Sequence, residues 1–294
     1  MKVLVTGATG FIGGKLVPRL AQEHEIVAIA RPGAAPAGGE VEWIEQDLTE
    51  PLHNEALPAR IDAVIHLAQS RLYKQFPEGA ADVFDINVQS TFRLLDYARA
   101  AGASSFLFAS TGGVYGSSDK AVSETDRLNP LNFYLSSKYG AESLVTSYNS
   151  FFTTVIFRFF FVYGPGQTQM MVPTLLARVL GGQKIVVEGN PGLRMNPIYV
   201  DDATGVFEPA LRLERSDLFN VAGDEAVTLS ELVQLMAGVS GREAHLEHAP
   251  ASQPGDLVGD NSKMKSVLGI RPETSLREGL TAMVEAMAAA EGTA

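Results

Sequence analysis

The chain has 294 residues, a formal net charge of −11 and no cysteine. The lack of cysteine excludes disulfides and cysteine-based metal or nucleophile sites, and we expect no metal centre of another kind. The acidic balance argues against nucleic acid as a partner, because phosphate binding needs a basic stripe. Hydrophobic residues make up 46%, yet no apolar run approaches the roughly 20 residues that cross a bilayer. We expect a cytoplasmic protein without a signal peptide or a membrane partner.

The first element is a short apolar strand that ends in closely spaced glycines. Residues 1–13 have the sequence MKVLVTGATGFIG, and an amphipathic stretch follows up to Leu20. This strand–turn–helix pattern is typical of a site for a dinucleotide pyrophosphate, because glycines let the phosphates approach the backbone and the helix N-terminus offers unpaired N–H groups. The residues expected to bind the cofactor here are Gly7, Gly10, Phe11, Ile12 and Gly13.

Strand-like runs then alternate with helical patterns up to about residue 165. The expected strands cover 3–5, 26–30, 41–44, 63–67, 106–109 and 154–160, and the expected helices cover 11–21, 80–101 and 133–150. Such alternation predicts an α/β fold with a Rossmann-type, doubly wound parallel sheet.

Beyond residue 165 proline and glycine become frequent and the expected elements shorten. Helices are predicted over 172–180, 202–211, 229–239 and 276–289, and a strand over 218–221 is predicted to return to the main sheet. We therefore expect a dinucleotide-binding Rossmann domain over 1–165 and a smaller C-terminal α+β substrate lobe over 166–294. Segments at about 196–221 are expected to return to the Rossmann domain.

A candidate catalytic pair lies on the predicted helix that begins near residue 133. Tyr134 and Lys138 are four residues apart and so share a helical face, about two dozen residues after a strand that ends in Ser110 and Thr111. Lowering the pKa of a phenol from about 10 to neutrality needs roughly 4 kcal/mol of phenolate stabilisation. An ammonium about 5 Å away supplies roughly 3 kcal/mol at an effective dielectric of 20, and an oxidised nicotinamide ring could supply the remainder. Tyr134 would then take the proton of an alcohol while a hydride leaves the same carbon, with Thr111 orienting the substrate.

Further motifs follow one another along nearly the whole chain. They are GATGFIG at 7–13, Asp47-Leu48, His66-Leu67-Ala68, Asn87-Val88, STGGVYG at 110–116, YLSSK at 134–138, RFFFVYGPG at 158–166, NPIYVDD at 196–202 and LREGL at 276–280. In this order they resemble the extended short-chain dehydrogenase/reductases of the NAD-dependent epimerase/dehydratase type, the group that contains UDP-galactose 4-epimerase. The resemblance implies a Rossmann fold, a nicotinamide cofactor and a sugar or nucleotide-sugar substrate.

The resemblance also assigns individual residues. It implies cofactor contacts for Asp47, Leu48, Leu67, Ala68, Asn87, Ser110, Tyr134, Lys138 and Phe160. Asp47 and Leu48 would flank the adenine, and Lys138 would also hold the nicotinamide ribose. Asn87 could instead be a helix-internal hydrogen bonder, and Phe160 could simply be core. The apolar faces of 80–101 and 133–150 would form a homodimer interface as in the family, or would simply cover the sheet.

The end of the second predicted strand departs from the usual pattern. Rossmann folds that bind NAD have an acidic residue there for the ribose diol, whereas this strand ends in Ala30 and Arg31. Arg31 can pair with a 2′-phosphate, which favours NADP slightly over NAD. The alternative is a solvated arginine and an Ala30 that tolerates NAD.

Positions expected to contact the substrate depart as well. Dehydratases of this family carry an Asp-Glu pair after the catalytic threonine, whereas this chain has Gly112 and Gly113, so dehydration is not expected. Phe161 stands where the family usually has asparagine, and Gln253 where an arginine usually holds the diphosphate. Arg194 is then the candidate that binds the substrate anion, and Thr111 is the candidate that binds the reacting hydroxyl. The substrate is a nucleotide sugar held differently, or a smaller sugar-like or lactone-like molecule.

Two reaction types fit these residues. The leading hypothesis is an NAD(P)-dependent epimerase of a nucleotide-activated sugar, which oxidises a hydroxyl to a transient ketone and returns the hydride to the opposite face. The alternative is an NADPH-dependent reductase of a keto-sugar or another small carbonyl compound, which Arg31 motivates. A non-catalytic dinucleotide sensor would have lost Thr111, Tyr134 or Lys138, and all three are present.

Overall fold

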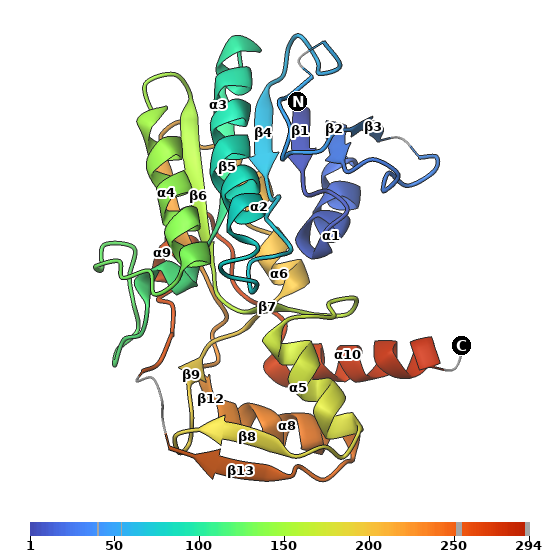
Figure 1. Cartoon of the computed structure of the whole chain (residues 1–294), viewed down its shortest axis with the longest axis vertical. Coiled ribbons are helices and arrows are strands. Elements are labelled where there is room, and N and C mark those ends of the chain that lie inside the picture. Colours follow the sequence, from blue (N-terminus) through green and yellow to red (C-terminus); the bar gives the residue numbers. More distant parts are fainter. Residues whose placement is uncertain (40, 54, 251–254, 292–294) are drawn as a thin grey trace. The chain divides into compact units, whose positions relative to one another are not determined.

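The structure is a computed structural model that describes residues 1–39, 41–53, 55–250 and 255–291. The chain divides into two compact units (Figure 1). The first comprises residues 1–114, 128–158 and 204–219, and the second comprises the remaining segments. The prediction places one boundary near residue 165. In the structure each unit consists of several chain segments, because the chain passes between the units after residues 114, 127, 158, 203 and 219.

A seven-stranded sheet in the order β11-β6-β5-β4-β1-β2-β3 forms the centre of the first unit. β1 (Lys2–Thr6) pairs in parallel with β2 (Glu25–Ala30) on one side and with β4 (Ala63–His66) on the other, so the strand order reverses at β1. The other strands are β3 (Glu42–Glu45), β5 (Ser105–Thr111), β6 (Thr153–Phe159) and β11 (Asp217–Val221). The predicted doubly wound fold is confirmed. In such sheets ligands bind at the carboxyl ends of the strands, at the point of reversal.

Helices cover this sheet, and α3 lies beside α4 (Figure 1). The helices of this unit are α1 (Phe11–Leu20), α2 (Ala80–Phe84), α3 (Ser90–Ala100), α4 (Phe133–Ser147) and α7 (Phe207–Ala210). The helix predicted over 80–101 is interrupted by a π-helical turn, η1 (Asp85–Gln89), and η2 (Gly112–Tyr115) is a 3₁₀ turn. Leu4, Val64, Leu94, Phe106 and Val145 belong to the buried core between sheet and helices, and each such side chain stabilises the fold by about 1.5–3 kcal/mol.

The second unit has its own core beneath α5 (Met171–Leu180), α8 (Leu229–Ser240) and α10 (Leu276–Glu291). Short strand pairs complete it: β7 (Val162–Tyr163) with β10 (Ile198–Tyr199), β9 (Arg194–Met195) with β12 (Val227–Thr228), and β8 (Ile185–Glu188) with β13 (Leu246–Ala249). α9 (Ser262–Val267) follows, and the helix predicted over 202–211 is two short helices, α6 (Val200–Thr204) and α7. Within the described part of the chain, no helix has both the length and the apolarity to span a membrane.

Candidate active site

The glycine-rich turn between β1 and α1 is packed so closely that side chains are excluded from it. Gly7 has a φ of +67°, and a Cβ at this position would lie 2.7 Å from the backbone nitrogen of Ala68, just after β4. A Cβ on Gly13 would overlap the carbonyl oxygen of Gly7. α1 starts after Gly10 without a side-chain cap, so its first N–H groups are available to an anion. This cradle at the strand-order reversal fits the pyrophosphate of a dinucleotide.

A buried histidine links β1 and α3 below this turn. His66 lies between the hydroxyls of Thr6 (Nδ1 to Oγ1, 2.6 Å) and Thr91 (Nε2 to Oγ1, 3.0 Å). Because Thr91 donates its hydroxyl hydrogen to the carbonyl of Asn87, His66 donates from Nε2 and accepts at Nδ1. Burial, and to a lesser degree the charge of Lys138, lowers the pKa of His66 to about 3. His66 is therefore a neutral structural residue.

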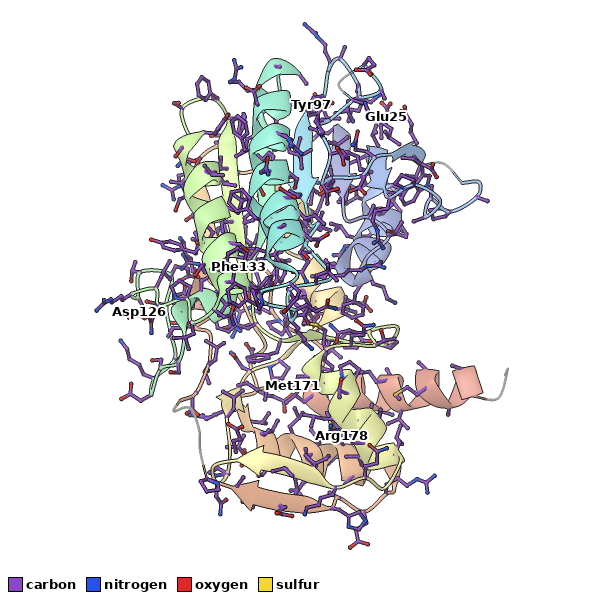
Figure 2. The ribbon with its side chains drawn as sticks, in the orientation of Figure 1. Glu25, Tyr97, Asp126, Phe133, Met171 and Arg178 are labelled. Carbon is purple, nitrogen blue, oxygen red and sulfur yellow. The ribbon has the colours of Figure 1, made fainter. Side chains whose placement is uncertain are left out.

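Two of the three candidate catalytic residues, Tyr134 and Lys138, lie on the first turns of α4. Asn132 caps this helix by accepting from the backbone nitrogen of Leu135 at 2.9 Å, and Figure 2 labels Phe133 at its start. Lys138 is 2% exposed. Its Nζ donates to the carbonyl of Ala109 at 2.8 Å and lies 4.7 Å from the ring centroid of Phe108. The Tyr134 hydroxyl donates to Oε1 of Gln69 at 2.9 Å, from a helix face that Lys138 shares.

The protonation of this pair differs from the prediction. Burial lowers the pKa of Lys138 to about 7, against the opposing effect of Glu142. Burial, with a smaller contribution from Tyr73, raises the pKa of Tyr134. The expected lowering of the Tyr134 pKa by Lys138 is thus wrong for the protein groups alone, because burial outweighs an ammonium that is itself only partly protonated near neutrality. The remaining stabilisation of the phenolate would have to come from bound molecules, as the prediction assumed for part of it.

Thr111 and Ser110 end β5, but their hydroxyls have different surroundings. Thr111 accepts from the backbone nitrogen of Gly113 at 3.2 Å, which leaves its hydroxyl hydrogen available for a substrate oxygen. Ser110 donates instead to the buried carboxylate of Glu142. The same carboxylate pairs with Arg158, with Oε1 3.1 Å from Nε and Oε2 2.7 Å from Nη2. No motif in the sequence indicated this buried ion pair, although Glu142 follows Lys138 at the spacing of one helical turn.

Asn87 is completely buried in the π-helical turn η1. Its Nδ2 donates to Oγ of Ser137 at 2.9 Å, and its Oδ1 accepts from the backbone nitrogen of Ser70 at 3.1 Å. Ser137 in turn donates to the carbonyl of Tyr134 at 2.7 Å. Asn87 therefore connects the loop after β4 with α4, rather than bonding only within its own helix. A direct contact with the cofactor stays a prediction.

The remaining cofactor candidates of the first unit lie at the ends of the strands. Asp47 accepts from both the backbone nitrogen (2.9 Å) and the hydroxyl (2.8 Å) of Thr49, whereas Leu48 is buried in the core. Leu67 and Ala68 are partly exposed where Gly7 touches the chain, and Arg31 is exposed directly after β2. Their assigned contacts stay predictions.

The candidates of the second unit are Phe160 for the cofactor and Phe161, Arg194 and Gln253 for the substrate. Phe160 is 1% exposed and stacks on Tyr115 with the ring centroids 6.1 Å apart, which favours the interpretation of this residue as core. Phe161 has a φ of +45° and is the only non-glycine residue with a positive φ among those described. Arg194 lies in β9. Its charge lowers the pKa of Glu231, although less strongly than the hydrogen bonds from Thr228 do. Gln253 lies outside the described residues.

Comparisons with known proteins identify the family and several relatives of this chain. The model of the NAD dependent epimerase/dehydratase family matches residues 3–222. A protein of Bacillus subtilis named as an uncharacterized UDP-glucose epimerase is 31% identical, with 96% of each chain covered. A GDP-6-deoxy-D-mannose reductase of Pseudomonas aeruginosa is 29% identical, again with 96% of each chain covered.

The fold is shared with a solved structure of known ligands. The UDP-glucuronic acid 4-epimerase from Bacillus cereus, in complex with UDP-glucuronic acid and NAD, superposes with a TM-score of 0.89 at 26% identity. The match covers 99% of this chain and 100% of that one. The family predicted from the motifs is confirmed, and with it an enzyme that uses a nicotinamide cofactor. The chain belongs to the NAD dependent epimerase/dehydratase family.

Proposed function

We propose that this protein is an epimerase of UDP-sugars that oxidises a ring hydroxyl to a ketone and reduces it again from the opposite face. The observation that carries the proposal is the arrangement of Tyr134 and Lys138 on one face of α4. The same unit places Thr111 at the end of β5 and the glycine turn at the strand-order reversal. The names of the relatives, which include a UDP-glucose epimerase and a UDP-glucuronic acid 4-epimerase, support the substrate class.

Each residue then has a defined task. Tyr134 takes the proton of the substrate hydroxyl and later returns it, while Lys138 favours the phenolate by its charge. Thr111 donates its hydroxyl hydrogen to the substrate oxygen as negative charge develops there. A bound nicotinamide supplies the chemistry that the protein lacks, since it accepts a hydride and gives it back.

The residues expected for dehydration, another reaction of the family, are absent from the end of β5. Gly112 and Gly113 stand where carboxylates would be needed for elimination. A Cβ on Gly113 would lie 2.6 Å from Cδ2 of Leu135, so a carboxylate side chain would require Leu135 to move. This favours epimerisation over dehydration.

The cofactor form is a finer part of the proposal. Arg31 is exposed at the end of β2 and suits the 2′-phosphate of NADP, whereas the Bacillus cereus relative is in complex with NAD. A charge-assisted bond of this kind contributes about 1.5–3 kcal/mol, which corresponds to at least a tenfold change in affinity. If Arg31 selects NADP, the variant Arg31→Ala will bind NADP⁺ at least tenfold more weakly and NAD⁺ unchanged. Equal losses for both dinucleotides would refute this role.

We also infer that the protein forms a homodimer through α3 and α4. Phe92 of α3 is 51% exposed and Tyr139 of α4 is 41% exposed, and these two helices pack side by side. Analytical ultracentrifugation should give a dimer for the wild type and a monomer for Phe92→Glu combined with Tyr139→Glu. A monomeric wild type would refute the inference.

Cofactor use distinguishes epimerisation from its alternative, a reductase. The purified protein, supplied with UDP-glucose or UDP-glucuronic acid, should form the epimer without net consumption of dinucleotide, and Tyr134→Phe should abolish this turnover. A reductase, which the Pseudomonas relative and Arg31 favour, would instead consume NADPH in equal amount with a keto-sugar. Stoichiometric NADPH oxidation with no epimer formed would overturn the proposal.

A further inference from the structure

The hydroxyl of Tyr134 has a hydrogen-bond partner that no sequence motif indicated. Tyr134 donates to the side-chain amide of Gln69 at 2.9 Å, and its ring lies against Tyr73 with the centroids 5.1 Å apart. Both partners belong to residues 67–73, which we call the tyrosine-covering segment. This segment follows β4 directly, and it is in the same compact unit as α4.

Backbone hydrogen bonds hold Gln69 in place from both sides. The nitrogen of Ala68 lies 3.4 Å from Oγ1 of Thr6, and the nitrogen of Ser70 donates to Oδ1 of the buried Asn87 at 3.1 Å. The hydroxyl of Ser70 donates to the carboxylate of Asp82. Gln69 is therefore an exposed side chain on a fixed backbone, which is the arrangement that orients a group toward a reacting atom.

The same contacts tie Gln69 to the helix that carries Tyr134. Asn87 bonds both to Ser70 and, at 2.9 Å, to Ser137, and Ser137 donates to the carbonyl of Tyr134 at 2.7 Å. The segment and the start of α4 are thus linked through one buried amide. This link fixes the backbone of Tyr134 relative to that of Gln69.

An amide differs from every charged side chain in what it offers to a phenol. Its oxygen accepts from the protonated phenol, and its NH₂ group donates to the phenolate, so a half-turn about the terminal bond of glutamine suits it to either form. A carboxylate only accepts, and an aliphatic side chain does neither.

Resting on the proposed role of Tyr134, we propose that Gln69 is a positioning residue whose amide remains bonded to the phenol oxygen in both protonation states. During oxidation the O–H bond of the substrate breaks and the O–H bond of Tyr134 forms, and the amide oxygen accepts from the new phenol. During reduction that proton returns to the substrate oxygen, and the amide NH₂ donates to the phenolate. The amide itself gains and loses no proton.

The test compares the pH dependence of kcat in Gln69→Glu with that of the wild type, using the full-length enzyme, its cofactor and UDP-glucose. A carboxylate at this distance disfavours the phenolate, so the acidic limb of the profile should move up by about 1–3 pH units. At pH 7 the rate should fall at least tenfold, while KM and the equilibrium affinity for the dinucleotide stay within about twofold. Gln75→Glu places the same charge on an exposed site of the neighbouring loop and should leave the profile unchanged.

A second variant, Gln69→Leu, removes both the acceptor and the donor that glutamine offers to the phenol oxygen. Gln69→Leu should lower kcat about tenfold, the contribution of roughly one hydrogen bond, with an unfolding temperature equal to that of the wild type. A Gln69→Glu profile that coincides with the wild-type profile would overturn the inference. Activity in Tyr134→Phe would instead overturn the proposed function, so the two failures are distinguishable.

Discussion

Removing the buried arginine that pairs with Glu142 should destabilise the first unit severely. Arg158 and Glu142 have side chains only 5% and 4% exposed, and their closest atoms are 2.7 Å apart. The substitution Arg158→Met removes both bonds that Arg158 donates to the buried carboxylate of Glu142, which keeps the bond from Ser110 and the influence of the Lys138 charge. Breaking such a pair from one side costs about 3–5 kcal/mol, because the carboxylate loses its bidentate cation in a medium of low dielectric.

The double variant Glu142→Leu with Arg158→Met should recover most of this loss, since replacing a buried pair by apolar groups is often close to neutral. Urea unfolding followed by the fluorescence of Trp43, the one tryptophan of the chain, reports on the sheet itself, because this residue lies in β3. Arg212→Met is the matched control, since Arg212 is 68% exposed in its pair with Glu208 and exposed pairs contribute at most about 1 kcal/mol. A loss of less than about 1 kcal/mol in Arg158→Met would refute the reasoning.

Two further predictions concern His66 and Phe161. The pKa of His66 is about 3 in the fold against 6.5 in a model peptide, so its contribution to stability is complete above pH 6.5 and is lost as the pH falls toward 3. Relative to His66→Gln, the wild type should therefore lose about 2 kcal/mol in urea unfolding between pH 7.5 and pH 5; an equal pH dependence would contradict this. Phe161→Asn should lower the free energy of unfolding by less than about 1 kcal/mol, because asparagine tolerates the φ of +45°. The same change at buried Phe160 should lower the free energy of unfolding by about 3 kcal/mol or more. Equal losses in the two variants would refute the different surroundings assigned to these residues.

Local patterns in the sequence predict most of the first unit. The apolar runs of β1, β2, β4 and β5 are short and rich in β-branched or aromatic residues, and a glycine follows β1, β2 and β5 within three residues, so these runs are recognisable by themselves. The spacing of Tyr134 and Lys138 follows from helical geometry alone. The π-helical turn around Asn87 is not predictable in this way, since it depends on buried bonds to Ser70 and Ser137.

The features that no local sequence pattern indicates arise from contacts between distant residues. β8 and β13 are four residues each, and they pair across some sixty positions of the chain, so neither has a periodic signal of its own. Gln69 is an ordinary polar residue until the fold brings it to Tyr134, 65 positions away. The raised pKa of Tyr134 in the protein alone was not predictable for a related reason, because the energetic effect of burial depends on the packed structure rather than on the spacing to Lys138.

The fate of the hydride tests the central claim most directly. UDP-glucose with deuterium on the sugar carbon that undergoes epimerisation, taken as C4 from the relative named as a 4-epimerase, is converted by the purified enzyme in ordinary water. If Tyr134 moves only the proton and the hydride returns within the same active site, the epimer retains the deuterium at that carbon, as NMR and mass spectrometry will show. Epimer that contains hydrogen from water at that carbon would contradict the mechanism.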